Sequence, residues 1–295
     1  MLDFLGVPTQ VLLGQVLLGL INGAFYATLS LGLAIIFGLL NIINFAHGAL
    51  YMMGAFIAWI GLNYLGINYW YALLLAPVLV GAIGILVQRT LIVRIAHLDH
   101  LYGLLLTFGI ALIVQGLFRN GFGSTGLPYQ IPNALQGARN LGFMILPIYR
   151  GWVICASFVV CLATWFLIEK TKLGAYLRAA TEDPVLTQAF GINVPLLVTL
   201  TYGFGVALAA FAGVLAAPIY SVDANLGGDL IIVVFAVVVI GGMGSIMGSI
   251  VTGFGLGVVE GLTKVFYPEA SSTVIFAIMV LVLLIKPAGL FGRIA

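Results

Sequence analysis

Residues 10–39 read QVLLGQVLLGLINGAFYATLSLGLAIIFGL and contain no charged side chain. The charge-free run is longer still, because no Asp, Glu, Lys or Arg occurs between Asp3 and Arg89. A helix that spans a bilayer needs about 20 apolar residues, so this run predicts about three crossings. The chain is 63% hydrophobic and 7% charged, whereas soluble domains are about half apolar and a quarter charged. The sequence therefore predicts a polytopic membrane protein.

The apolar segments have the pattern of helices. In hydrocarbon the backbone must satisfy its own hydrogen bonds, which leaves helices or closed barrels. Barrel strands alternate in polarity over about ten residues, and IIVVFAVVVI (residues 231–240) does not alternate. We therefore expect an all-α, polytopic integral membrane helix bundle of about 8–10 transmembrane helices, forming a single domain over residues 1–295. Nine crossings are predicted, at residues 10–39, 45–62, 69–88, 100–118, 149–168, 195–217, 230–246, 248–266 and 271–286.

The first predicted span is unusually long. As one helix it would measure about 45 Å at 1.5 Å per residue, which exceeds a hydrocarbon core of about 30 Å. It must therefore tilt strongly or break, and Asn22-Gly23 is the expected weak point.

Lys and Arg are enriched on the cytoplasmic side of membrane proteins. Placing the loops at residues 88–99 and 169–194 and the C-terminus in the cytoplasm puts most of the Lys and Arg residues on that side. The longest loop on the other side, residues 119–148, is rich in Gly and Pro and is predicted to be irregular. It is either a simple connector or a docking surface for an outer partner.

Two glycine-rich segments interrupt the apolar pattern, at residues 37–54 and 239–255. Paired interruptions of this kind are typical of transporter repeats, whose broken helices line a central path. In the second half, glycines also recur every four residues, at Gly244 and Gly248 and at Gly253, Gly257 and Gly261. Small residues at this spacing let helix backbones approach closely. We expect these glycines to pack helices, with a gating motion as the alternative.

The polar stretch LGAYLRAATEDPVLTQAFGINV, residues 173–194, differs from the rest of the chain. Asp183 is a good N-cap, Pro184 is favourable at the first helical position, and Gly191 suits a left-handed C-cap. These signals predict a short helix over residues 184–190 outside the membrane, preceded by a helical turn at residues 174–180. Two turns are not stable alone in water. The helix must therefore pack on its own bundle or be covered by a partner protein.

Several polar residues lie at expected membrane depth, where ionisable groups are costly and usually functional. Glu260 precedes Lys264 by four residues, so an ion pair on one helix face is expected; a protonated or path-lining carboxyl is the alternative. His47 is either an interfacial residue bonded to a carbonyl or part of a gate. Three amides either hydrogen-bond between helices or line the translocation path: Asn22, Asn41 and Asn44.

No enzyme site is visible in the sequence. No metal-ligand spacing or nucleophile motif occurs, and we expect no cofactor or metal bound by this chain. The net charge of +2 is too small to indicate binding to nucleic acid. Cys155 and Cys161 are six residues apart and are expected to be free thiols. None of the four lysines follows a glycine, so the GxxxxGK[ST] phosphate-binding loop is absent from the sequence.

The polar stretch also carries a family resemblance. Gly174, Arg178-Ala179, Ala189 and Gly191-Ile192-Asn193 resemble the cytoplasmic EAA loop of bacterial ABC importer permeases, although Arg178 stands where the older consensus has Glu. Residues 32–56, 241–253 and 283–292 are similar to the LivH-type permease subunits of branched-chain amino-acid importers. The resemblance covers nearly the whole chain in the same order. It implies that residues 169–194 form a loop that couples to an ATPase through Gly174, Arg178, Ala179, Glu182, Asp183, Pro184, Ala189 and Gly191.

The resemblance implies a permease subunit of an ATP-driven importer of leucine, isoleucine and valine in the bacterial inner membrane. ATP and Mg²⁺ would then bind to a separate ATPase at the cytoplasmic loop. A second homologous permease would complete the path, and an extracytoplasmic binding protein would deliver the substrate. The alternatives are an ABC permease for urea or short amides, an ion-coupled secondary transporter of small amino acids, and a channel or structural membrane partner.

Overall fold

The computed structural model describes residues 3–4, 7–40, 44–96 and 98–292 of the chain. It is an all-helical bundle, as predicted, and the strands in the described part are two short hairpins. The α-helices are α1 Thr9–Leu40, α2 Ala46–Leu65, α3 Tyr69–Val87, α4 Val93–Ile95, α5 His100–Phe122, α6 Ile148–Lys170, α7 Lys172–Glu182, α8 Pro184–Ala189, α9 Val194–Ala216, α10 Gly228–Gly241, α11 Ile246–Phe266 and α12 Val274–Ile285.

Within the described residues, seven helical segments are long and apolar enough to cross a membrane: Thr9–Gly38, Ala46–Leu65, Tyr69–Ile95, His100–Phe122, Ile148–Lys170, Val194–Ala216 and Ile246–Phe266. The third is longer than expected, because a π-helical turn at Gln88–Ile92 joins α3 to α4. Arg89 and Arg94 therefore lie on helical turns rather than in a loop.

Two of the nine predicted crossings are shorter than the sequence suggests. The helix expected at residues 230–246 is α10, with 14 residues, and the one expected at 271–286 is α12, with 12 residues. At 1.5 Å per residue they measure about 21 and 18 Å, less than a hydrocarbon core of about 30 Å. A turn with left-handed glycines at Gly242 and Gly244 ends α10 early. Each helix can therefore reach only part-way through a bilayer.

Helix α1 is unbroken, so the expected weak point at Asn22-Gly23 is wrong. A Cβ atom at Gly23 would lie 2.9 Å from the Cα atom of Phe254 on α11, and one at Gly19 would lie 2.5 Å from the carbonyl oxygen of Gly257. The glycines of α1 therefore serve close packing against α11. An unbroken helix of this length must tilt to fit a bilayer.

The same contact explains the glycine repeat of α11. Gly253 meets the backbone of Ala27, while Gly257 and Gly261 meet the α1 backbone around Gly19. We call this contact the glycine seam. The packing interpretation is confirmed there, but Gly244 lies in the turn before α11, with φ +81°, and not on a helix.

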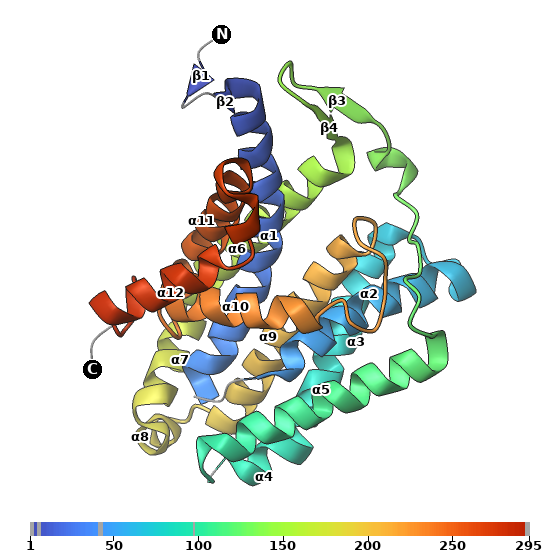
Figure 1. Ribbon diagram of the computed structural model, residues 1–295. Coiled ribbons are helices and arrows are strands. Elements are labelled where there is room, and N and C mark those ends of the chain that lie inside the picture. The colour runs from blue at the N-terminus through green and yellow to red at the C-terminus, as the bar shows by residue number, and fades with distance from the viewer. Residues whose placement is uncertain (1–2, 5–6, 41–43, 97, 293–295) are drawn as a thin grey trace.

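The two ends of the bundle differ (Figure 1). One end carries the N-terminus and the hairpin of β3 (Ala138–Asn140) and β4 (Ile145–Pro147), and the opposite end carries α8 and α4. The small hairpin β1 (Asp3–Phe4) and β2 (Val7–Pro8) precedes α1. The segment at residues 119–148, predicted to be irregular, also contains the β3–β4 hairpin, a 3₁₀ turn at Asn133–Leu135 and the end of α5.

Candidate functional site

The polar stretch forms two consecutive helices, α7 and α8, outside the long apolar helices. The Asp183 carboxylate accepts a hydrogen bond of 2.9 Å from the backbone N–H of Leu186, and Pro184 opens α8. Gly191 has φ +83°, which is the left-handed conformation expected of a glycine after a helix. The predicted short helix and both of its end signals are confirmed. The preceding helical turn is longer than expected, because α7 covers 11 residues.

Helix α7 is held against the bundle by one face. Leu177 and Ala180 are buried, and a Cβ atom at Gly174 would overlap the carbonyl oxygen of Ile168 at the end of α6. Arg178 pairs with Glu169 at 3.3 Å, with about half of each side chain exposed. Only a residue without a side chain fits at position 174, so Gly174 fixes the angle between α6 and α7.

Helix α8 presents apolar side chains to the outside. Val185 is 76% exposed, Leu186 55% and Phe190 78%, whereas Thr187 is the buried residue of the helix. Figure 1 shows α8 projecting at the end of the molecule, beyond α7. A soluble surface rarely carries such large apolar side chains side by side unless they meet a partner. We call Val185, Leu186 and Phe190 the α8 apolar face.

The eight residues implied to couple to an ATPase lie in one continuous protrusion. Gly174, Arg178, Ala179 and Glu182 are on α7, Asp183 joins the two helices, Pro184 and Ala189 are on α8, and Gly191 follows it. All of them except Gly174 are exposed. The structure thus places these residues together, and their role toward an ATPase stays a prediction.

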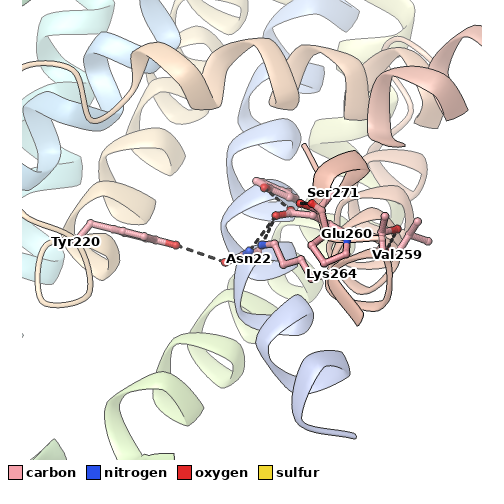
Figure 2. A network of polar contacts seen from close by, with 9 residues as sticks. Asn22, Tyr220, Val259, Glu260, Lys264 and Ser271 are labelled. Carbon is pink, nitrogen blue, oxygen red and sulfur yellow. Dashed lines mark hydrogen bonds and ion pairs between the residues drawn. The ribbon is translucent and has the colours of Figure 1, made fainter. Parts of the chain in front are cut away.

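The polar residues inside the bundle do not form one site. Glu260 of α11 accepts a hydrogen bond of 2.6 Å from Lys264 and one of 2.7 Å from the hydroxyl of Tyr26 on α1. Asn22 lies 3.5 Å from the same carboxylate and 3.4 Å from the Tyr220 hydroxyl, as Figure 2 shows. The predicted Glu260–Lys264 pair is confirmed. It forms a network with α1.

Asn44 and His47 lie elsewhere, at the start of α2. The Asn44 amide donates to the Tyr202 hydroxyl of α9 at 3.1 Å, so it bonds between helices as expected. The His47 Nε2 atom lies 3.1 Å from the carbonyl oxygen of Leu29, so the predicted carbonyl contact is confirmed, while the interfacial position of His47 stays a prediction. Among the described residues its Nδ1 atom has no hydrogen-bond partner. Asn41 lies outside the described residues.

Three tyrosines that complete these contacts were missed in the sequence: Tyr26, Tyr202 and Tyr220. Tyr26 follows Asn22 by four residues and therefore shares its helix face, so this partner could have been found. Tyr202 and Tyr220 are distant in sequence from the residues that they contact, and no local pattern indicates them.

Comparison with known proteins identifies the family. The sequence matches the family described as "Branched-chain amino acid transport system / permease component" over residues 15–283. The chain belongs to this permease family. It is 30% identical over 294 residues to the high-affinity branched-chain amino acid transport system permease protein BraD of Pseudomonas aeruginosa, covering 95% of this chain and 96% of that protein.

Two further members of the permease family come from Escherichia coli. The chain is 30% identical over 299 residues to the permease protein LivH, covering 95% of this chain and 96% of LivH. It is 26% identical over 291 residues to LivM, covering 90% of this chain and 67% of LivM. No solved structure is significantly similar to it. The chain is therefore a transport permease component that crosses the membrane several times, and the resemblance seen in its sequence is confirmed.

Proposed function

We propose that this permease is the transmembrane subunit of an ATP-driven importer of branched-chain amino acids and that α7 and α8 bind its ATPase subunit. The substrate follows from the relatives, which are named as high-affinity branched-chain amino acid permeases. The observation that carries the ATPase contact is the α8 apolar face, since Val185 and Phe190 are each more than three-quarters exposed on a helix with defined caps.

The surroundings of α8 support a cytoplasmic position. Lys170, Lys172 and Arg178 lie in or beside α7, and Arg89 and Arg94 lie near α4 at the same end of the molecule (Figure 1). Basic residues beside membrane spans favour the cytoplasmic side. We therefore infer that α8 faces the cytoplasm of a bacterial cell, where an ATPase holding ATP and Mg²⁺ would bind, and that the β3–β4 hairpin faces a substrate-binding protein outside.

A second permease subunit is part of the proposal. The chain is similar both to LivH and to LivM, two permeases of one bacterium. This double similarity supports a path formed between two related subunits, of which this chain provides one. The amide residues Asn22, Asn41 and Asn44, together with His47 and Glu260, stay candidates for lining it.

An ion-coupled transporter is less well supported by the geometry. Such a transporter needs a buried carboxylate that can take up and release an ion along the path. Glu260 is buried, but Lys264 neutralises it at 2.6 Å and Tyr26 donates to it as well. The carboxylate is therefore engaged in a structural network.

The ATPase contact can be tested by site-specific photo-crosslinking in membranes. A photo-reactive amino acid at Phe190 should capture the ATPase subunit of the proposed importer. The same probe at Ile145 of β4, 68% exposed at the opposite end, is the matched control and should not. Phe190→Glu should also abolish uptake of radiolabelled leucine, while Ile145→Glu should not. Capture from Ile145 and not from Phe190 would refute the proposal.

A further inference from the structure

A cavity of about 460 Å³ lies behind α7, and Gly174 and Arg178 of the proposed coupling loop are among the residues that line it. It is a half-open pocket lined by α1, α6, α7, the turn between α10 and α11, and the C-terminal segment. Most of its wall is apolar, formed by Phe37, Trp165, Leu177, Met243, Met247 and Phe291. Pockets for small molecules measure about 300–1,000 Å³ and are mostly apolar with few polar groups. This cavity therefore has the size for a small, largely apolar molecule.

The rim of the cavity carries charges of both signs. Arg178 and Glu169 line it and face each other at 3.3 Å. Lys170 lies 5.5 Å from the centre of the Trp165 ring, which is part of the wall. Because the Arg178 and Glu169 side chains are 52% and 48% exposed, their pairing with each other contributes little to stability. Each can therefore turn to a ligand group at small cost.

The inner end of the cavity is closed by packed side chains. Ala34 and Ile35 of α1 are 0% and 5% exposed, and Ile168 of α6 is 6% exposed. At Gly38 a Cβ atom would lie 3.2 Å from the Cα atom of Gly244, so α1 and the α10–α11 turn are in close contact there. A molecule in this cavity would therefore enter and leave at the end of the protein that carries α7. The cavity is not a passage along α1 through this chain.

We propose that this cavity binds a free aliphatic α-amino acid from the cytoplasm. The ligand carboxylate would bind Arg178, the ammonium group would bind Glu169, and the aliphatic side chain would fill the apolar wall. A zwitterion carries one negative and one positive group, which match the positive charge of Arg178 and the negative charge of Glu169. A regulatory role for this cavity rests on the proposed function. If the permease imports aliphatic amino acids, the transported product is itself the ligand of the cavity.

The position of the cavity defines what the ligand would do. One wall is α7, which leads directly into α8, and the opposite walls are α1 and the turn before α11. A ligand that contacts both sides would hold α7 against the bundle. Since binding shifts a population only toward the state that binds better, accumulated amino acid would favour the state with α7 docked and would slow transport.

Trp165 allows binding to be measured without any transport activity. The other tryptophans, Trp59, Trp70 and Trp152, are replaced by Phe, and the full chain is placed in lipid nanodiscs. L-leucine should change the emission of Trp165. The analogues 4-methylpentanoate and 3-methylbutylamine, which lack the ammonium and the carboxylate respectively, should bind roughly tenfold more weakly, the equivalent of about 1.4 kcal/mol.

Matched variants of α7 and its rim locate the site. Thr181 lines the cavity, whereas Ala175 is exposed on the same helix and does not. Thr181→Tyr should fill the space and weaken leucine binding at least tenfold, and Ala175→Tyr should leave it unchanged. Glu169→Gln tests the rim charge without filling the cavity and should weaken leucine but not 4-methylpentanoate.

The regulatory step is measured on the assembled transporter. ATP hydrolysis is recorded with binding protein already saturated by leucine, so that added free leucine can act only elsewhere. The rate of ATP hydrolysis should fall as free leucine is added to the parent transporter, and added leucine should not change the rate in Thr181→Tyr. A Trp165 signal that does not change with leucine, or that shows either analogue binding as tightly as leucine, overturns the inference even if hydrolysis is normal. If the rate of ATP hydrolysis is the same with and without this permease, the proposed function is wrong. The fluorescence evidence for leucine binding is then unaffected.

Discussion

Replacing Lys264 by methionine should destabilise the permease more than replacing Glu260 by glutamine. The Glu260 side chain is 11% exposed, whereas the Lys264 side chain is 41% exposed. Lys264→Met leaves a buried carboxylate with only Tyr26 and the distant Asn22 as donors. Removing one partner of a buried pair costs about 3–5 kcal/mol, and the remaining bond from Tyr26 places this case near 3 kcal/mol.

Glu260→Gln has a smaller effect for two reasons. The neutral amide still accepts a hydrogen bond from Tyr26, and the Lys264 ammonium can reach water. The expected cost is that of about one hydrogen bond, ~1 kcal/mol. The difference between the two variants, about 2 kcal/mol, corresponds to roughly 4 °C in the midpoint of thermal unfolding.

Cys161 provides the assay, because it is buried while Cys155 is exposed. In a Cys155→Ser background, a thiol-reactive dye reports unfolding of the purified permease. The double variant Glu260→Gln/Lys264→Met should resemble Glu260→Gln, because no unpaired charge is buried. A Lys264→Met midpoint equal to or above that of Glu260→Gln would show that burial of the carboxylate does not govern this network.

Three further predictions concern packing, hydrogen bonding and backbone conformation. Gly257→Leu in the glycine seam should lower the unfolding free energy by about 1–3 kcal/mol, whereas Gly255→Leu, which has open space beside it, should have little effect in the same dye assay. Tyr202→Phe removes the partner of the buried Asn44 amide and should cost about 1–3 kcal/mol; a midpoint unchanged from the parent would contradict this. Gly191 has φ +83° and no atom lies within 4 Å of where a Cβ would be, so Gly191→Val strains only the backbone at the end of α8. This variant should lower the amount of leucine taken up per ATP hydrolysed. An unchanged ratio would count against α8 as the coupling element.

Features set by neighbouring residues were predictable from the sequence. The caps of α8 depend on Asp183, Pro184 and Gly191. Each of these residues affects only its own backbone conformation or a backbone group a few residues away. The Glu260–Lys264 pair follows from a spacing of one helical turn. The length of the apolar runs predicts helices because lipid leaves the backbone few alternatives.

Features set by distant residues were not predictable. The Asn22-Gly23 pair indicates a helix break when the sequence is considered alone. In the structure the helix continues, because Gly23 packs closely against α11. The end of α10 depends on the C-terminal segment, since the backbone N–H groups of Leu290 and Phe291 donate to the carbonyls of Ile240 and Gly241. The cavity behind α7 is likewise formed by four separate stretches of the chain.

The glycine seam has a mechanical consequence. Where two backbones touch without side chains between them, no layer of rotamers exists that can slide or rearrange, so α1 and α11 behave as a single stiff lever. In the proposed coupling, a movement of α7 and α8 would therefore be passed to both helices together. We expect any change of shape during transport at contacts between interdigitating side chains, such as the contact of the short helices α10 and α12 through Ile240 and Ile275.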